Sequence, residues 1–414
     1  MQRSPSRKSD WPPALVLAPG NYVAPLGVMR SLRSLEVRVF GLETSGVSLW
    51  KHSRHCAGLL RIGENGSPSR TDPRATLAEL LRASHVLGGG AVLIPCSDEW
   101  ALFIARHAEP LASVYRFARL TGQLATQLGD KQALQSLASH TGVAVPESVQ
   151  PANRAELVNL APLLEYPILV KTAVTRSTGN QMEVVNNAEG LVAAYERLND
   201  PGNLICQRLV SGTHEDGWLF NGYFDDQSRC VASFSGRKLR QWPPGRGVTV
   251  LAEAKRNPEV EEISIQFLES IGYRGAVDMD FMRDSTDGVY KLLDVNPRLG
   301  GVFRCFVDTA GLDVASAMYL DLIGQAVRQQ GQREPHRFVH EGGYLVSTLK
   351  VKRLSAPVVA WREIRGAEMG TFKPLDPLPF IVQMVSTIRV HAGARLRRRR
   401  RMSDQERLSL KPVH

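Results

Sequence analysis

Two aspartates stand in short apolar runs that a hairpin would bring together. Asp280 lies in GAVDMDF and Asp294 in YKLLDVNPRLGG, and the polar linker between the runs ends in Asp287-Gly288, a common hairpin turn. We therefore expect two antiparallel strands with the two carboxylates side by side. Carboxylates forced together in an apolar setting repel strongly unless a cation lies between them.

Two further polar residues follow the second aspartate. Asn296 offers a neutral oxygen ligand, and Arg298 adds a fixed positive charge. Oxygen ligands of this kind suit Mg²⁺, which often takes only one or two carboxylates together with the phosphates of a nucleotide. The alternative is an ordinary hairpin whose acids face solvent. Asp278, two residues before Asp280, is as consistent with a structural partner as with a metal ligand.

A lysine at the end of another apolar run suggests a phosphate clamp. Lys171 closes YPILVK and is followed by the Ser/Thr/Gly loop TRSTGN, so a fixed ammonium and loop N–H groups could enclose a phosphate. Lys131, after Gly129-Asp130, is a second lysine for such a site. Neither lies in a GxxxxGK[ST] motif, which argues against a P-loop. A strand-end lysine that simply reaches water is the alternative.

The composition predicts a soluble cytoplasmic protein of two or three domains. The chain has 414 residues, 43% of them hydrophobic and 22% charged. Its five cysteines are scattered without a CxxC pair, which favours reduced, buried thiols. The first apolar run is broken at Pro19-Gly20, too early for a signal-peptide core. No stretch approaches the ~20 apolar residues that span a bilayer.

The formal charge of +10 is concentrated near the C-terminus, where Arg395–Arg401 holds six arginines. No helix-turn-helix, zinc finger or RNP pattern accompanies it, so we expect no specific nucleic-acid partner. We expect a solvated terminus. The minority alternative is a weak contact with an anionic membrane, which would make this cytoplasmic protein peripheral to the membrane. An apolar helical face is predicted just before the tail and is expected to pack on the protein's own surface: Phe380, Ile381, Met384 and Val385.

Strands alternate with helices in the first part of the chain, which predicts a parallel α/β unit. The strands are expected at Ala14–Leu17, Val37–Gly41 and Ala91–Pro95, and the last is followed by a helix capped by Ser97 or Asp98. Within Thr121–Gly142 a helix is predicted to begin near Gly129-Asp130-Lys131. Later strands are expected at Tyr166–Ala173, Met182–Val185, Asn203–Val210, Trp218–Phe224 and Cys230–Gly236, and helices at Asn187–Leu198 and Pro258–Ser270.

The order of these motifs resembles the ATP-grasp superfamily. It runs from Gly129-Asp130-Lys131 through YPILVK and its loop, QRLVSGTHE and DMDF to DVNPR. SFSGRKLRQWPP and the DEW of SDEW are most similar to the D-aspartate-ligase-like carboxylate–amine ligases. The resemblance implies an α/β (α+β ATP-grasp) fold class. Its domains would be a flexible N-terminus 1–12, a Rossmann-like preATP-grasp domain 13–115, an ATP-grasp domain of two subdomains 116–330, a small C-terminal extension 331–393 and a basic tail 394–414.

The resemblance also implies roles for individual residues, with ATP and Mg²⁺ (Mn²⁺ as an alternative) as cofactors. Arg298 and Lys171 would be catalytic, and the metal ligands would be Asp280, Asp294 and Asn296. ATP would be bound by Lys131, Lys171, Ser177, Thr178, Gly179, Gln207, Arg208, Leu209 and Glu215. The sequence departs from the family pattern in having one glycine in the loop and Gln207 where many members have glutamate.

The activity implied is an ATP-dependent carboxylate–amine ligase that forms an amide through an acyl phosphate and releases ADP and phosphate. Small carboxylates and amines would be its substrates, and a homodimer is left open. One alternative is an ATP-grasp enzyme acting on bicarbonate or a phosphorylated acid. Another is a non-catalytic nucleotide-binding regulatory or scaffold protein. Candidate substrate contacts are Arg304 and three residues of a predicted basic loop, for which a solvated loop is equally consistent: Arg237, Lys238 and Arg240.

Overall fold

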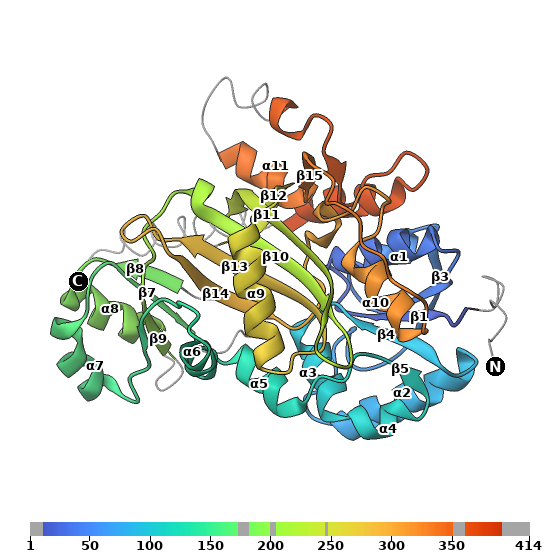
Figure 1. The fold of residues 1–414 in the computed structure, drawn as a ribbon, viewed down its shortest axis with the longest axis horizontal. Coiled ribbons are helices and arrows are strands. Elements are labelled where there is room, and N and C mark those ends of the chain that lie inside the picture. The colour runs from blue at the N-terminus through green and yellow to red at the C-terminus, as the bar shows by residue number, and fades with distance from the viewer. Residues whose placement is uncertain (1–10, 173–181, 199–203, 245–246, 351–360, 391–414) are drawn as a thin grey trace, which may run out of the picture.

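The computed structural model describes residues 11–172, 182–198, 204–244, 247–350 and 361–390. These residues form three sheets with helices packed against them (Figure 1). One sheet has five strands in the order β3-β2-β1-β4-β5, one has seven in the order β14-β13-β10-β11-β12-β15-β16, and one has four in the order β6-β9-β7-β8.

The five-stranded sheet is parallel throughout, as the alternation of strands and helices predicted. It spans residues 14 to 116, while the domain boundaries stay predictions. Its edge strand β3 was not predicted, because its CAGLL sequence is only half-buried and gives a weak pattern. Its strands are β1 (Ala14–Leu17), β2 (Val39–Leu42), β3 (Cys56–Leu60), β4 (Ala91–Pro95) and β5 (Tyr115–Arg116), with helices α1 (Ala24–Arg33), α2 (Pro73–Val86), α3 (Asp98–Arg106) and α4 (Ala108–Ala112).

Caps place two polar residues that matter later. The hydroxyl of Ser97, not the carboxylate of Asp98, caps α3 by accepting from the N–H of Trp100, so Asp98 is free to point elsewhere from the first turn. The predicted helix at Lys131 is confirmed as α6 (Lys131–His140), and Asp130 caps it through two N–H groups. Another helix, α5 (Gly122–Gly129), precedes α6 where none was predicted.

The four-stranded sheet is antiparallel and forms a separate lobe with its own core (Figure 1, green). It consists of β6 (Ser148–Val149), β7 (Ile168–Thr172), β8 (Met182–Val185) and β9 (Leu204–Arg208), with α7 (Arg154–Leu160) and α8 (Ala188–Leu198) packed on it. Its predicted strands are therefore confirmed to within a few residues.

The seven-stranded sheet lies at the centre. The antiparallel strands β10 (Gly217–Phe224), β11 (Cys230–Trp242), β12 (Val248–Ala254), β13 (Gly275–Arg283) and β14 (Tyr290–Asn296) form most of it. Helix α9 (Pro258–Ser270) buries Val260, Phe267 and Leu268 with residues of β10, β13 and β14. Helix α10 (Val314–Leu322) joins the core shared with the N-terminal unit.

The predicted basic loop is wrong. Strand β11 continues to Trp242 because β12 pairs with it as far as Val248, so Arg237, Lys238 and Arg240 lie on a strand. Each of the three side chains pairs with a carboxylate, as described below, and this pairing offsets the cost of placing a charge on a partly buried strand.

The C-terminal segment is built into the central sheet. Strands β15 (His336–Val339) and β16 (Glu368–Met369) extend it beyond β12, and α11 (Glu341–Lys350) follows β15. A helix over residues 378–390 ends the described chain. The packed face predicted on this helix is wrong for two of its four residues: Ile381 and Val385 are exposed, while Phe380 and Met384 are half-buried. The polar Gln383 is buried as well. Gln383 can be buried because its amide bonds with Thr371 Oγ1 (2.9 Å) and lies 3.2 Å from His340 Nε2.

All five cysteines are unpaired, as predicted, and Cys96, Cys206 and Cys305 are buried. Burial raises the pKa of the Cys206 thiol to about 12. Within the described residues, no helix is both long enough and apolar enough to cross a bilayer.

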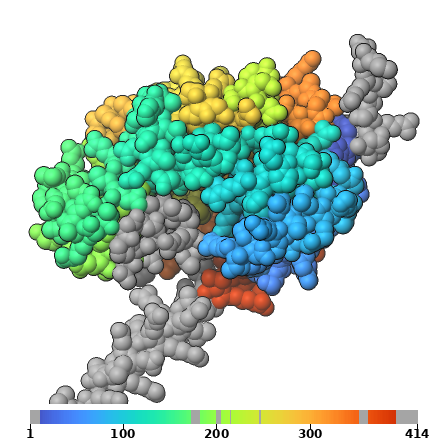
Figure 2. Space-filling view, turned by 90° about the horizontal axis from the view of Figure 1, so that it is seen from below, coloured from blue at the N-terminus to red at the C-terminus, as the bar shows by residue number. Residues whose placement is uncertain are grey.

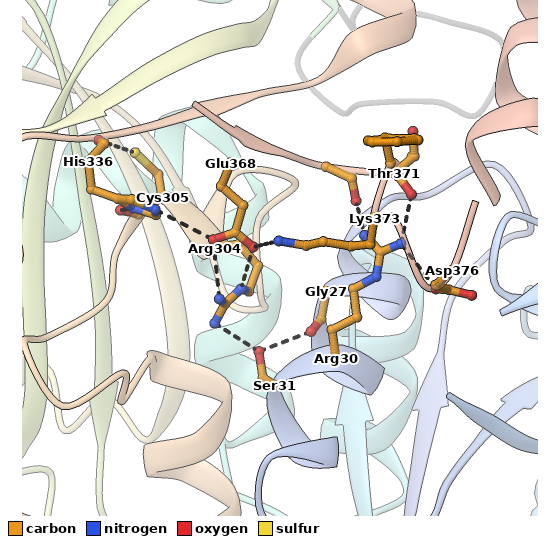
Figure 3. A network of polar contacts seen from close by, with 12 residues as sticks. Gly27, Arg30, Ser31, Arg304, Cys305, His336, Glu368, Thr371, Lys373 and Asp376 are labelled. Atoms are coloured by element: carbon orange, nitrogen blue, oxygen red, sulfur yellow. Dashed lines mark hydrogen bonds and ion pairs between the residues drawn. The ribbon is translucent and has the colours of Figure 1, made fainter. Parts of the chain in front are cut away.

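A buried polar network joins the N-terminal unit to the C-terminal segment (Figure 3). Arg304 binds Asp313 at 2.5 Å and Glu368 at 3.2 Å, and it lies 3.3 Å from the hydroxyl of Ser31 on α1. These carboxylates raise the pKa of Arg304 against the cost of its burial, and Arg304 contributes to holding the pKa of Glu368 well below its usual range. Arg304 therefore neutralises two carboxylates of the protein itself, those of Asp313 and Glu368.

Arg30 forms the second half of this network. It donates to the carbonyls of Gly370 and Thr371 and pairs with Asp376 at 3.1 Å. Asp376 also accepts from the hydroxyl of Ser53. In Figure 2 the C-terminal segment (red) accordingly lies against the N-terminal unit (blue).

Replacing Arg304 tests whether this network is structural. Arg304→Ala leaves the fully buried Asp313 without its cation, so we expect the free energy of unfolding to fall by about 3–5 kcal/mol in urea denaturation. The control Arg61→Ala breaks an exposed pair with Glu43 and should change it by less than ~1 kcal/mol. Unchanged stability together with a raised KM for an acid would instead make Arg304 a substrate contact.

Candidate active site

The hairpin of β13 and β14 places two carboxylates opposite each other. Asp280 pairs with Asp294, and two residues along the hairpin Asp278 pairs with Asn296. Directly opposed side chains on neighbouring antiparallel strands lie within reach of each other. The predicted juxtaposition of Asp280 and Asp294 is therefore confirmed.

Each of the two acids is held by a lysine from another element. Lys131, from the first turn of α6, bonds with Asp294, and Lys238 on β11 lies 2.8 Å from Asp280. Burial alone would raise the pKa of Asp294, but Lys131, Lys171 and Arg298 together hold it below its usual value. Both carboxylates therefore lie beside a lysine ammonium, which offsets their mutual repulsion.

Arg298 closes one end of this group. Its Nη2 donates to Asn296 Oδ1 at 3.0 Å, and its Nε donates to Asp98 at the start of α3, also at 3.0 Å. Its Nη1 lies 3.5 Å from Asp278. Arg298 is largely buried, so the guanidinium is fixed between the hairpin and the N-terminal unit.

Asp278 acts as a partner of its neighbours. It accepts from Asn221 Nδ2 at 2.9 Å and lies beside Arg298. Burial and the nearby Asp280 raise the pKa of Asp278 to about 7. Of the two roles that the sequence left open for Asp278, its contacts favour the structural one.

Lys171 lies at the end of β7, beside Gln207 on the neighbouring strand β9. Its ammonium donates to Gln207 Oε1 at 2.7 Å. Burial and the charge of Lys131 lower the pKa of Lys171 to about 8, although Asp294 opposes the shift. Among the described residues, the hydrogen-bond partner of this ammonium is the neutral amide of Gln207. The loop residues proposed to act with it, Ser177, Thr178 and Gly179, lie outside the described residues.

A small cavity lies between the four-stranded lobe and β14. Its volume is about 220 Å³ including open solvent, and its lining includes Lys131, Gln207, Leu292 and Leu293. Beyond it, the N–H groups of Arg208 and Leu209 already donate to the carbonyls of Glu147 and Pro167. Of Gln207, Arg208 and Leu209, which were all predicted to bind ATP, Gln207 is the one that lines the cavity.

The remaining predicted site residues pair with protein carboxylates. Arg237 binds the exposed Glu215 at 3.3 Å. Arg240 pairs with Glu363 at 2.6 Å and stacks on the ring of Tyr344, so it contacts the C-terminal segment. Arg304 belongs to the network of Figure 3. Of the four predicted substrate contacts, Lys238 is the one that the described contacts join to the hairpin acids.

The donor set fits a hard divalent cation bound with a nucleotide. The described residues contain no cluster of three or more His, Cys, Asp and Glu side chains that could enclose a metal alone. Asp280, Asp294 and Asn296 instead give two carboxylates and one amide oxygen. Such a partial set suits Mg²⁺, which usually keeps waters and takes phosphate oxygens as further ligands.

Comparison with solved structures identifies this architecture. An N5-carboxyaminoimidazole synthetase from Staphylococcus aureus, in complex with ADP, superposes with a TM-score of 0.63 at 12% identity, covering 83% of this chain and 86% of that one. The biotin carboxylase domain of the 2-oxoglutarate carboxylase of Hydrogenobacter thermophilus, in complex with MgADP and bicarbonate, gives 0.59 at 17% identity, covering 79% and 73%. The chain has the ATP-grasp fold.

Sequence comparison gives a weaker, consistent result. The D-aspartate ligase of Enterococcus faecium is 23% identical over 241 residues, which cover 54% of this chain and 56% of that enzyme. The chain thus matches little more than half the length of this relative. No family model matches the chain. The predicted resemblance to the ATP-grasp superfamily, and to D-aspartate ligase within it, is confirmed.

Three features of this candidate site were not predicted from the sequence. No contact with the hairpin was predicted for Asp98 or Asn221, and Lys238 was predicted to contact a substrate, whereas it binds Asp280. Asn221 carries a usable signal, because it is an amide inside the otherwise apolar run WLFNGYF and is fully buried. The partners of Asp98 and Lys238 depend on tertiary packing and leave no local signal.

Lys171→Met tests whether this lysine binds phosphate. A lowered pKa means that folding disfavours the charged lysine, so an uncharged side chain of similar length should keep or raise the melting temperature without ligand. The stabilisation that Mg²⁺-ATP gives the wild type should shrink to a small fraction in a thermal melt. The exposed Lys51→Met should respond to ATP like the wild type, and an intact response in Lys171→Met would contradict the assignment.

Proposed function

We propose that this chain is an ATP-dependent carboxylate–amine ligase. The observation that carries the proposal is the opposed pair Asp280 and Asp294, each held by a lysine, with Arg298 bonded to Asn296 at the end of the same hairpin. The ATP-grasp fold and the similarity to a D-aspartate ligase support an ATP-dependent reaction between an acid and an amine.

Charge is the main obstacle to such a reaction. A carboxylate that attacks ATP brings two anions together, so the site must neutralise the γ-phosphate before transfer. Asp280, Asp294 and Asn296 would hold Mg²⁺, which supplies charge neutralisation at the phosphate oxygens. Lys131 and Lys171 approach the same place from α6 and β7, and their charges would bind the phosphates directly.

Arg298 would orient the acid. Its guanidinium is fixed by Asp98 and Asn296, so it can present a rigid positive edge to a substrate carboxylate. A carboxylate oxygen then attacks the γ-phosphorus, the bond to the ADP oxygen breaks, and an acyl phosphate and ADP result. An amine attacks the acyl carbon and expels phosphate, which leaves an amide, and the surplus proton passes to solvent.

Two other functions use the same features. An ATP-grasp enzyme that carboxylates with bicarbonate has support from the solved structure in complex with MgADP and bicarbonate. A nucleotide-binding scaffold would keep the fold without turnover. We favour the ligase for two reasons. Both acids of the hairpin are present and each is paired with a lysine. The chain is also similar to a D-aspartate ligase, which favours an amine as the second substrate. The proposal does not specify whether the chain assembles as a homodimer.

Asp294→Asn tests the metal site. The amide keeps the shape of the side chain and removes the charge that binds Lys131 and a metal, so ADP release should fall by at least about a thousandfold, equivalent to several kcal/mol. The matched control is Asp287→Asn at the turn of the same hairpin, where the acid pairs with Lys291 and is exposed. Asp287→Asn should keep wild-type turnover. If Asp294→Asn turned over as fast as Asp287→Asn, the assignment of Asp294 as a metal ligand would be refuted.

A substrate panel separates the three functions. ADP release should require Mg²⁺, a small carboxylic acid and an amine, and hydroxylamine in place of the amine should trap the acyl phosphate as a hydroxamate. ADP release with bicarbonate alone, and none with acids, would favour the carboxylating enzyme. ATP binding by calorimetry without any ADP release across the panel would favour the scaffold.

A further inference from the structure

The last described helix, over residues 378–390, turns an apolar stripe outward. The exposed fractions are 52% for Leu378, 50% for Ile381, 42% for Val385 and 61% for Ile388. Their spacing of three, four and three residues puts them on one side of the helix. We call these four residues the outer stripe.

The opposite side of the helix is the packed one, and it is partly polar. Gln383 is buried against Thr371 and His340, and Val382 packs on the main core. At Gly342 on α11 an added Cβ would lie 3.3 Å from the Gln383 side chain, so the two helices approach closely. A surface helix normally buries its apolar side and exposes its polar side. This helix instead exposes the four apolar side chains of the outer stripe and buries the polar Gln383, while Val382 on its packed side is half-buried.

Exposed apolar side chains are concentrated in the C-terminal segment that contains this helix. Of the eighteen large hydrophobic residues exposed in the described part of the chain, ten belong to residues 341–390. Leu375, one turn before the stripe, is 77% exposed. The other eight are spread over the N-terminal unit, the four-stranded lobe and the central sheet. Grouped exposed apolar residues mark interaction surfaces more often than scattered ones do.

The charge around the outer stripe is positive. The sequence from Thr371 to Val390 has one acidic residue, Asp376, which is buried and bonded to Arg30 and Ser53. Arg389, beside Ile388, is exposed. The sequence of residues 391–414, which follows the helix, contains eight basic and two acidic residues.

We propose that the outer stripe docks on the surface of an anionic lipid bilayer. An apolar helix face flanked by basic residues is the composition that lies in the interface of such a bilayer, where the face is buried and the cations meet lipid phosphates. A second copy fits less well, because a symmetric contact through the stripe would bring two strongly basic segments together. The proposal does not depend on the ligase function.

The test is flotation of the full chain with lipid vesicles. Wild-type protein should bind vesicles of phosphatidylglycerol and phosphatidylcholine at low salt and should not bind vesicles of phosphatidylcholine alone. Binding should weaken as salt rises, since salt screens the basic residues. The double variant Ile381→Gln, Val385→Gln should lower the partition coefficient about tenfold, because the stripe loses its two central apolar side chains.

Matched controls separate the stripe from surface hydrophobicity and from charge alone. Val86→Gln, Val158→Gln removes two exposed valines from α2 and α7 and should bind like the wild type. A variant with glutamine in place of Arg397–Arg401 should lose the preference for anionic lipid. Circular dichroism and melting temperature should match the wild type for the stripe variant, since both positions are exposed.

Three outcomes would overturn the proposal. The first is no binding of the wild type to anionic vesicles at low salt. The second is equal binding by the stripe variant and the wild type, which would assign binding to the arginines alone. The third is a dimer in sedimentation equilibrium that the stripe variant converts to monomer without any vesicle binding, which would make a second copy the occupant.

Discussion

The opposition of Asp280 and Asp294 across one hairpin is the constraint on which the site depends. Two carboxylates in register on adjacent strands repel, and burial makes the repulsion stronger because the local dielectric is low. The fold answers with one lysine for each acid. Lys131 lies at the start of α6 and Lys238 lies on β11, outside the hairpin. The hairpin, α6 and β11 must therefore all be in place before the repulsion between the two acids is offset.

The same requirement connects the N-terminal unit to the hairpin. Arg298 reaches Asp98 at the start of α3, and Ser97 takes the capping role that would otherwise occupy Asp98. Arg304 and Arg30 form a second connection, which joins α1 to the C-terminal segment through the buried carboxylates of Glu368 and Asp376. The N-terminal unit is therefore fixed by ion pairs at two places, one at the site and one away from it. Arg298 is thus oriented by Asp98 of the N-terminal unit and Asn296 of the hairpin, while the C-terminal segment contacts other arginines.

The features that could be predicted from sequence are those set by residues close together in the chain. The hairpin acids, the strand that carries Lys171 and the helix that begins at Lys131 each follow from patterns of a few residues. The features that could not be predicted depend on partners distant in sequence. Lys238 looked like a loop residue until pairing with β12 placed it on a strand, and the final helix was assigned the wrong face because Gln383 finds buried partners in Thr371 and His340.

The departure from the family pattern at Gln207 has a physical consequence at Lys171. A glutamate at this position would form an ion pair with the lysine and would offset the cost of its burial. The neutral amide of Gln207 orients the ammonium at 2.7 Å but adds no opposite charge. Burial and Lys131 therefore bring the pKa of Lys171 down to about 8, although the charge of Asp294 opposes the shift. Near pH 7 the lysine is still mostly protonated. Its charge therefore remains available for an incoming anion, and binding a phosphate there would relieve a cost that the free protein carries.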